Sequence, residues 1–316
     1  MIQIALCTDN NYAMPAGVMM YSVCVHTPGV SFNVIVPEDF SEENRAKLRR
    51  VTEPFDAAVD FIVIPENLAD GFPVGREDQP EHISIAAYYR LFLGRLLSPE
   101  IDKVIYLDCD LICLSSLEEL WAVDLKGAPL ACVPEIQRPW QHPQLRLGYD
   151  ESIPYFNSGV LLINLDYWRR NGVESRFMDF LATSREKIQF HDQDILNWAF
   201  HDSALFLPPR FNAMDFLFHK GLADCDFPFP VEDAEQARTN PVIVHFTYKH
   251  KPWIKGGSHT YRKAFLDFKS KTPWKGQRLI MRKSDTFKGK VADLLVFFGL
   301  YRYHDDYIVI PENTEH

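Results

Sequence analysis

Two aspartates follow directly on a short apolar run. Residues 103–107 form the run, and Asp108 and Asp110 come after it with one residue between them. Side chains two positions apart on an extended backbone point to the same side, so both carboxylates are expected to face one way. Carboxylate oxygens suit Mg²⁺ or Mn²⁺, and such an ion can bridge the phosphates of a nucleotide. The other interpretation is a pair that only caps a turn, because aspartate is common where strands end.

A histidine and a lysine stand at the end of a second apolar run. Residues 242–245 end in His245, and Lys251 follows six positions later. An imidazole nitrogen beside carboxylate oxygens suits a transition ion such as Mn²⁺ better than Ca²⁺, and the lysine can meet a terminal phosphate as a point charge. Taken alone, His245 fits a satisfied polar residue and Lys251 a solvated loop lysine. Together with Asp108 and Asp110, they predict a metal and phosphate site.

Short β-rich runs alternate with helical patterns and supply the strand ends that such a site needs. The expected strands are residues 2–7, 31–36, 58–64, 103–107, 130–133, 159–164 and 242–245. The expected helices are residues 17–26, 41–51, 85–97, 175–184, 195–200 and 261–270, and the acidic segment 224–241 is expected to be a long loop. The early β-α-β-α order predicts an α/β fold, with a largely parallel twisted sheet covered by helices on both faces. Ligands of such sheets bind beyond the carboxyl ends of the strands, near the point where strand order reverses.

The composition narrows the class of protein. Of the 316 residues, 47% are apolar, which allows a large core, and no run of about 18 apolar residues indicates a membrane span. The formal charge of −10 argues against broad nucleic-acid binding through phosphate neutralisation. Residues 1–7 lack the features of a secretory signal, and the six cysteines have no zinc-ligand spacing. We therefore expect a cytoplasmic protein with reduced thiols.

Six motifs follow one another along most of the first 255 residues. They begin at residues 5, 82, 107, 155, 191 and 245 and read ALCTDNNY, HISIAAYYRL, LDCD, YFNSGVLLIN, HDQDILN and HFTYKHKPW. In this order they resemble glycosyltransferase family 8, which includes glycogenin-like enzymes and bacterial lipopolysaccharide hexosyltransferases. The resemblance implies the GT-A (nucleotide-diphospho-sugar transferase) fold and a retaining enzyme. Such an enzyme moves glucose or galactose from a UDP-sugar to a saccharide acceptor, here in cell-surface polysaccharide or lipopolysaccharide synthesis.

The resemblance assigns roles to the charged residues of the two strand ends. It implies that Asp108, Asp110 and His245 ligate Mn²⁺ or Mg²⁺ and that Lys251 contacts the diphosphate. It places Arg90 against the phosphates or the donor sugar, with Asp108 also touching donor hydroxyls. A divalent ion with a nearby lysine stabilises the charge on departing UDP without protonating it.

The resemblance also assigns residues around the nucleoside and the sugar. Those expected at the uridine and ribose are Asp9, Asn11 and Tyr12, and those expected around the transferred hexose are Asn157, Asp192 and Gln193. Acceptor attack on the face that UDP leaves would retain the configuration, and Gln193 is the candidate group on the opposite face.

Some positions in these motifs depart from the family or allow a second interpretation. The family usually has Gly three residues after the metal-binding His, and this sequence has Tyr248 there. Gly often marks a positive φ or a close backbone approach, so the contact between the backbone at this position and the diphosphate is expected to differ. Asp194 is expected to cap the helix 195–200, with Asp192 as the sugar contact, and Asn157 also fits a simple turn.

A change of composition divides the chain at residue 274. Residues 1–274 are expected to form the catalytic domain, and residues 275–316 a basic and aromatic extension. The basic residues of the extension are Lys275, Arg278, Arg282, Lys283, Lys288, Lys290 and Arg302. This composition suits a segment that rests on anionic lipid at the inner face of the cytoplasmic membrane. The alternative is a C-terminal helix packed on the core or on a dimer partner.

Three other functions compete with hexose transfer. A strand ending in Asp-x-Asp also opens phosphatases of the haloacid-dehalogenase type, but there the motif lies near the N-terminus. Those phosphatases usually have Thr or Val after the second Asp, where this sequence has Leu111. Tyr248 makes an inactive nucleotide-sugar-binding protein conceivable, and glycogenin-like self-glucosylation needs an acceptor tyrosine that no motif identifies. The acceptor is expected at loops 135–151 and 211–229. Their aromatic residues, which fit sugar stacking or the core equally well, are Trp140, Tyr149, Phe216 and Phe218.

Overall fold

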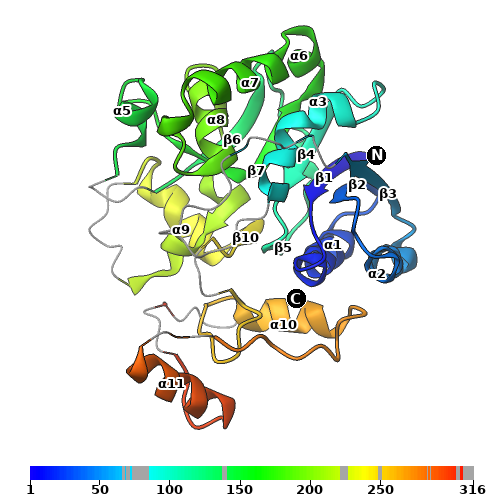
Figure 1. Cartoon of the computed structure of the whole chain (residues 1–316), viewed down its shortest axis with the longest axis vertical. Helices are drawn as coiled ribbons and strands as arrows, with labels where there is room; N and C mark the ends of the chain where they lie inside the picture. The colour runs from blue at the N-terminus through cyan, green and yellow to red at the C-terminus, as the bar shows by residue number, and fades with distance from the viewer. Residues whose placement is uncertain are drawn as a thin grey trace.

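The protein is an α/β structure built on one large sheet (Figure 1). The computed structural model describes residues 1–65, 68, 72, 85–136, 141–220, 227–247, 251–282, 284, 286–303 and 307–308. The seven-stranded sheet has the order β3-β2-β1-β4-β7-β6-β8, and a three-stranded sheet has the order β5-β10-β9. The strands are β1 Ile2–Cys7, β2 Val30–Pro37, β3 Ala58–Ile64, β4 Lys103–Leu107, β5 Leu111–Cys113, β6 Leu130–Pro134, β7 Phe156–Asn164, β8 Leu205–Phe206, β9 Ala213–Met214 and β10 Ile243–His245.

Most strand pairs of the large sheet are parallel, which confirms the predicted fold class. β1 is parallel to β2 and β4, β2 to β3, and β6 to β8, whereas β7 runs antiparallel to β4 and β6. The chain builds outward from β1 through β2 to β3 and then crosses to β4 on the other side of β1. The strand order therefore reverses between β1 and β4, and the carboxyl ends of these two strands form the place where such sheets bind ligands.

Helices cover both faces of the sheet, as expected. The α-helices are α1 Ala13–His26, α2 Glu42–Thr52, α3 Leu93–Leu96, α4 Glu118–Trp121, α5 Pro143–Leu147, α6 Leu165–Arg170, α7 Val173–Thr183, α8 His191–Phe200, α9 Val231–Thr239, α10 Arg262–Ser270 and α11 Phe287–Phe297, and the 3-10 helix η3 spans Ile85–Phe92. One core layer joins the sheet to α1, α2 and α10, and the other joins it to η3, α3, α6, α7 and α8.

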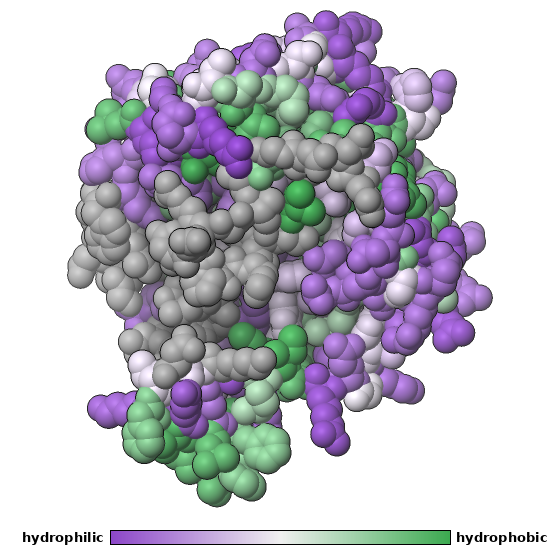
Figure 2. All heavy atoms as spheres, in the orientation of Figure 1, coloured by the Kyte–Doolittle hydropathy of each residue, from purple (hydrophilic) through white to green (hydrophobic). Residues whose placement is uncertain are grey.

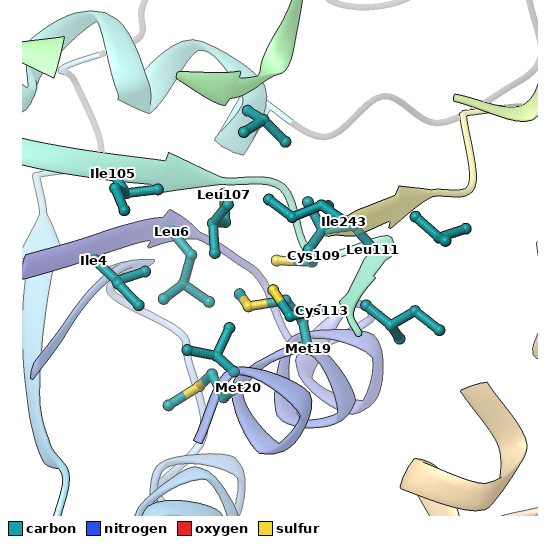
Figure 3. Packing of buried hydrophobic residues seen from close by; sticks show 14 of the residues in the cluster. Ile4, Leu6, Met19, Met20, Ile105, Leu107, Cys109, Leu111, Cys113 and Ile243 are labelled. Carbon is teal, nitrogen blue, oxygen red and sulfur yellow. The ribbon is translucent and has the colours of Figure 1, made fainter. Parts of the chain in front are cut away.

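The strands β1 and β4 divide their side chains between these two layers. The residues that face α1 are Ile4, Leu6, Ile105 and Leu107, which lie over Met19 and Met20 (Figure 3). Ala5 and Tyr106 point into the other layer, because successive side chains of a strand alternate between its faces. Packing on both faces fixes the two strands, and with them the polar residues at their carboxyl ends.

Four of the expected segments differ in the structure. The predicted loop 224–241 contains α9 over its described part, so that prediction is wrong. Glu232 and Asp233 in the first turn and Arg238 in the last favour this helix through its dipole, and Ala234 and Ala237 are buried. The expected helix 85–97 is η3 followed by the short α3. The helices expected at 17–26 and 195–200 each begin four residues earlier, at Ala13 and at His191.

The C-terminal segment packs against the body at several points. Trp274 lies over Gly17 of α1, where an added Cβ would come 2.2 Å from Trp274 Cζ3. Ile280 N–H donates to Trp253 O at 3.0 Å, and Ile308 N–H donates to Phe218 O at 2.7 Å. Helices α10 and α11 lie at the lower end of the molecule in Figure 1. Among the helices that the structure describes, none combines the length and apolar character needed to cross a membrane.

Candidate active site

The two aspartates and the histidine that the sequence predicts as metal ligands meet at the carboxyl end of β4. Asp110 leads into β5, and β5 pairs antiparallel with β10 in a register that sets His245 opposite Leu111. His245 Nε2 lies 3.1 Å from Asp110 Oδ1 and 3.8 Å from Asp108 Oδ2. One ligand atom from each of the three residues lies within 4.8 Å of the others. The small sheet is thus the element that brings the histidine to the carboxylates.

The surroundings of this Asp-Asp-His cluster fit a divalent ion. Two carboxylates and one imidazole form a donor set that suits Mn²⁺ and accepts Mg²⁺. Gly159 of β7 faces the cluster without a side chain, and an added Cβ would come 2.2 Å from His245 Cε1 and 2.7 Å from Asp108 Oδ2. A glycine here leaves the room that the His245 and Asp108 side chains occupy, so both ligands can stay in the cluster.

Lys251 reaches the same cluster, as the sequence predicts. Its Nζ donates to Asp110 Oδ2 at 2.7 Å and to Phe246 O at 2.6 Å. Burial raises the pKa of Asp110, but the cations of Lys251 and His245 outweigh it and hold that pKa well below its usual range. Burial likewise lowers the pKa of His245, whereas Asp110 raises it, and the net shift is upward. Asp110 is therefore ionised and set against two positive groups.

Arg90 lies beneath the cluster and joins two carboxylates. Its side chain is buried, its Nη2 donates to Asp108 Oδ1 at 2.8 Å, and its Nε lies 3.0 Å from Asp192 Oδ2. The guanidinium also stands 4.3 Å from the ring centroid of Tyr106, whose hydroxyl donates to Asp108 Oδ1 at 3.0 Å. Burial raises the pKa of Asp192 to about 6, with Arg90 opposing the shift. Arg90 thus orients Asp108 and Asp192 together.

The residues predicted at the nucleoside lie at the end of β1. Asp9 Oδ1 accepts hydrogen bonds from Asn11 N at 2.9 Å and Tyr12 N at 3.0 Å, which orders the turn into α1. Asn11 is exposed, while the Tyr12 ring packs edge-on against Trp253 with centroids 5.9 Å apart. Burial raises the pKa of Tyr12 to about 12, and Lys251 lowers it. Tyr12 therefore connects the end of β1 to the metal cluster.

The residues predicted around the hexose gather at the start of β7 and the first turn of α8. Asn157 Nδ2 donates to Gln193 Oε1 at 3.1 Å, and Asp192 lies beside them through its contact with Arg90. The helix α8 begins at His191, so Asp194 lies within its first turn and is not the N-cap that the sequence suggests. Asp194 instead accepts hydrogen bonds from the backbone N–H groups of residues 189 and 190. It also accepts one hydrogen bond from each of Arg146 Nη1 and Nη2.

Two residues of this site are not predicted from the sequence. Asn212 is fully buried and its Oδ1 lies 2.9 Å from His245 Nδ1. Glu135 accepts a hydrogen bond from Gln193 Nε2 at 2.5 Å, and burial raises its pKa. Glu135 directly follows β6, and a carboxylate at a strand end is the signal that could have identified it. Asn212 stands between apolar residues ahead of a two-residue strand and gives no such signal.

The aromatic residues proposed for the acceptor have different surroundings. Phe218 is fully buried in the core, and Phe216 packs partly against it. Tyr149 stacks on His201 with ring centroids 4.3 Å apart. Trp140 and Tyr248 lie outside the described residues. The five described cysteines are free and buried, so none of these five forms a disulfide.

Comparison with known proteins places this arrangement in a family. A family model described as glycosyl transferase family 8 matches residues 3–256. General stress protein A of Bacillus subtilis is 29% identical over 280 residues, covering 86% of this chain and 94% of that protein. The lipopolysaccharide 1,3-galactosyltransferase of Salmonella typhimurium is 28% identical over 286 residues, covering 86% and 78% of the two chains.

A solved structure extends the comparison to the fold. The galactosyltransferase LgtC, crystallised in complex with donor and acceptor sugar analogues, matches with a TM-score of 0.77 and 26% identity. The match covers 92% of this chain and 100% of that one. The large sheet flanked by helices is thus the GT-A fold that the motifs predicted. Since the family model spans most of the sequence, the chain belongs to glycosyltransferase family 8.

Proposed function

We propose that this protein transfers a hexose, glucose or galactose, from a UDP-sugar to a saccharide acceptor with retention of configuration. The observation that carries the proposal is the Asp108, Asp110 and His245 cluster, with Lys251 beside it, at the switch point of a glycosyltransferase fold. These three residues would hold Mn²⁺ or Mg²⁺. The similarity to a lipopolysaccharide 1,3-galactosyltransferase supports an acceptor in lipopolysaccharide or cell-surface polysaccharide synthesis.

Different residues of the chain would contact the diphosphate and the nucleoside of the donor. A bound divalent ion would offset the negative charge on the diphosphate, so the leaving group needs no proton. Lys251 stands 2.7 Å from Asp110 and can turn its ammonium toward the same diphosphate. Asp9, Asn11 and Tyr12 would hold the uridine and ribose at the end of β1, next to this lysine.

The sugar would lie between Asp192, Asn157 and Gln193. Arg90 holds Asp108 and Asp192, whose remaining oxygens can accept hydrogen bonds from donor hydroxyls. Gln193 Oε1 already accepts from Asn157 Nδ2 and Ser158 N. These two hydrogen bonds hold the oxygen in place, which suits it to line the face of the sugar opposite UDP. The acceptor would attack on the other face, the one that UDP leaves, and such attack retains the configuration.

The site also bears on the competing functions. The chain belongs to glycosyltransferase family 8, which favours a donor-binding role for Asp108 over that of a phosphatase nucleophile. An inactive binding protein and a self-glucosylating enzyme keep the same donor site. They differ from the proposal in the fate of the sugar after the donor has bound.

The test measures UDP release from UDP-glucose and from UDP-galactose, with Mn²⁺ or with a chelator. We expect Mn²⁺-dependent release from one donor, its loss in Asp110→Asn, and its retention in Asp60→Asn, a variant of an exposed strand residue. Binding of UDP-sugar without release would favour a binding protein. Growth of the enzyme's own intact mass would favour self-glucosylation. Absence of both release and Mn²⁺-dependent UDP binding would refute the metal site.

We further propose that residues 275–316 form an extension to the catalytic unit 1–274 and rest on an anionic membrane. Helix α11 presents an exposed apolar stripe, visible as the green surface at the lower end of Figure 2. The stripe consists of Phe287, Val291, Leu294 and Leu295 of the helix and Phe298 at its C-cap. Their spacing of three and four residues puts them on one helical face.

Basic residues accompany the stripe, which favours anionic lipid as its partner. The exposed ones among the described residues are Lys275, Arg278, Lys288, Lys290 and Arg302. A helix with an apolar face and nearby cations lies in the headgroup region of a membrane, where each basic residue contributes about 1 kcal/mol. This would place the enzyme at the inner face of the cytoplasmic membrane, where lipid-linked saccharides are accessible.

Vesicle flotation tests the membrane proposal. We expect the protein to float with vesicles of phosphatidylglycerol and to stay behind with phosphatidylcholine. The double variant Leu294→Glu, Phe298→Glu should lose flotation while keeping UDP release, because neither residue contacts the donor site. Val231→Glu, which changes an apolar residue 63% exposed on α9, is the matched control. Equal flotation of the double variant and wild type would contradict the proposal.

A further inference from the structure

Five polar side chains form one hydrogen-bonded series across the active site. Asn212 Oδ1 lies 2.9 Å from His245 Nδ1, and Asn212 Nδ2 donates to Asn157 Oδ1 at 2.9 Å. Asn157 Nδ2 donates to Gln193 Oε1 at 3.1 Å, and Gln193 Nε2 donates to Glu135 Oε2 at 2.5 Å. The three amides Asn212, Asn157 and Gln193 are here called the amide relay. They connect the imidazole of His245 in the metal cluster to the carboxylate of Glu135, which bonds to Gln193 among the residues proposed to surround the hexose.

Two backbone N–H groups fix the direction of the amide relay. Ser158 N–H donates to Gln193 Oε1 at 3.1 Å, and Gly159 N–H donates to Asn157 Oδ1 at 2.9 Å. A backbone N–H can only donate, so both side-chain atoms must be amide oxygens. The oxygen of Asn157 then requires the nitrogen of Asn212 as its second donor. The oxygen of Asn212 is left facing His245.

We propose that the amide relay makes His245 a metal ligand by holding its proton on Nδ1. An amide oxygen accepts and cannot donate, so Asn212 Oδ1 requires a proton on the nearer ring nitrogen. The other ring nitrogen, Nε2, lies 3.1 Å from Asp110 Oδ1, on the side of the carboxylates. In the neutral imidazole with its proton on Nδ1, the lone pair of Nε2 would be the one that binds an ion there. Asn212 acts through His245 and is therefore a positioning residue. The inference rests on the proposed function, whose metal site it concerns.

The amide relay also makes the metal end and the sugar end one unit. Each amide donates to one neighbour and accepts from another, so turning one of them would set like groups against each other at both of its bonds. Asn212 is fully buried and Asn157 is 7% exposed, so bulk solvent cannot replace a lost partner. Glu135 ends the series as an acceptor and holds Gln193 with its nitrogen turned away from β7.

Two substitutions at Asn212 separate the ends of the relay. Asn212→Leu removes both the acceptor for His245 and the donor to Asn157. Asn212→Asp keeps an oxygen for His245 Nδ1–H but cannot, as a carboxylate, donate to Asn157. Mn²⁺ affinity is read from the free Mn²⁺ signal by electron paramagnetic resonance, and UDP-sugar turnover is measured separately at saturating Mn²⁺.

We expect Asn212→Leu to weaken Mn²⁺ binding by about 10–100-fold, the usual cost of removing a partner that orients a ligand histidine. Asn212→Asp should keep Mn²⁺ affinity within about threefold, because a carboxylate also accepts the hydrogen bond from the second ring N–H of a metal-bound histidine. Since the donor to Asn157 is lost, kcat should fall about tenfold. The matched control is Asn33→Leu, which replaces a 5% exposed asparagine of β2 that bonds to Gln3 and Ile4. It should leave Mn²⁺ affinity unchanged.

Contrary results are distinct for the inference and for the proposed function. Wild-type affinity for Mn²⁺ in a folded Asn212→Leu protein would overturn the relay alone. If the leucine variant does not fold, the aspartate variant decides, and equal losses of Mn²⁺ affinity and kcat in it would overturn the relay. A wild-type protein that binds no Mn²⁺ would overturn both the relay and the metal site on which the proposed function depends.

Discussion

The metal cluster and helix α11 differ in where their partners come from. In the cluster, groups from other parts of the chain meet each ligand: Lys251 lies against Asp110, Arg90 against Asp108, and Asn212 against His245. On α11, large apolar side chains face solvent, with Phe287 84% and Phe297 56% exposed. Buried polar groups need partners, and exposed apolar patches mark contact with something else. Each ligand of the cluster therefore has its partner within the chain, whereas α11 leaves a row of apolar side chains exposed.

The largest effect is expected from a change inside the cluster that adds one methyl group. Gly159→Ala would set a Cβ 2.2 Å from His245 Cε1 and 2.7 Å from Asp108 Oδ2. Both ligands would have to move, so we expect Mn²⁺ affinity and UDP release to fall by at least about 100-fold, since misplacement of roughly 1 Å can cost that much. Titration with Mn²⁺ and a UDP-release assay measure the two losses.

Gly94→Ala is the control for that experiment. Its added Cβ would meet Trp168 Cβ at 3.7 Å, an ordinary contact. The control should bind Mn²⁺ and release UDP at close to the wild-type level. If Gly159→Ala did the same while remaining folded, the cluster would not be the tightly fitted site described here.

A smaller effect is expected from pH, again at the cluster. Burial lowers the pKa of His245, but the carboxylates of Asp110 and Asp108 together raise it above its ordinary value, which is about 6.5. A proton on Nε2 competes with the ion, so apparent Mn²⁺ affinity should fall as pH falls through that raised pKa. Below it, one competing proton costs about tenfold per pH unit. Binding titrations at several pH values between about 6 and 8 measure this slope, and a flat profile would exclude His245 as a ligand.

Much of the cluster could be predicted from the sequence because local order specifies it. Asp108 and Asp110 follow an apolar run, and His245 ends another, so strand geometry alone puts polar groups at the edge of the sheet. The alternation of β1 and β4 between two core layers is equally local. These predictions need only the period of a strand and the rule for where parallel sheets bind ligands.

The partners of the cluster could not be predicted in the same way. Asn212 reaches His245 only because β9 pairs with β10, and each of these strands has too few residues to show a period. The sequence predicts a loop where α9 forms, because the polar residues of this helix outweigh its two buried alanines. It predicts a late start for α8 because Asp192 and Asp194 fit caps, whereas both are bound by arginines from distant segments. Long-range pairing decides the first and the third of these cases, and charges at the two ends of the helix favour α9.

The smallest effect on catalysis is expected where α11 joins the body. Gly256 has a φ of +80°, and an added Cβ would come 2.7 Å from Val296 Cγ1 of α11. Gly256→Ala should loosen the helix, seen as faster proteolysis and amide exchange across residues 287–297, yet leave UDP release within about twofold, because the strain of order 1 kcal/mol falls outside the cluster. Gly276→Ala, with no neighbour within 4 Å of its added Cβ, is the control. A loss of UDP release as large as that of Gly159→Ala would show that the cluster depends on the docking of α11 and is not complete without it.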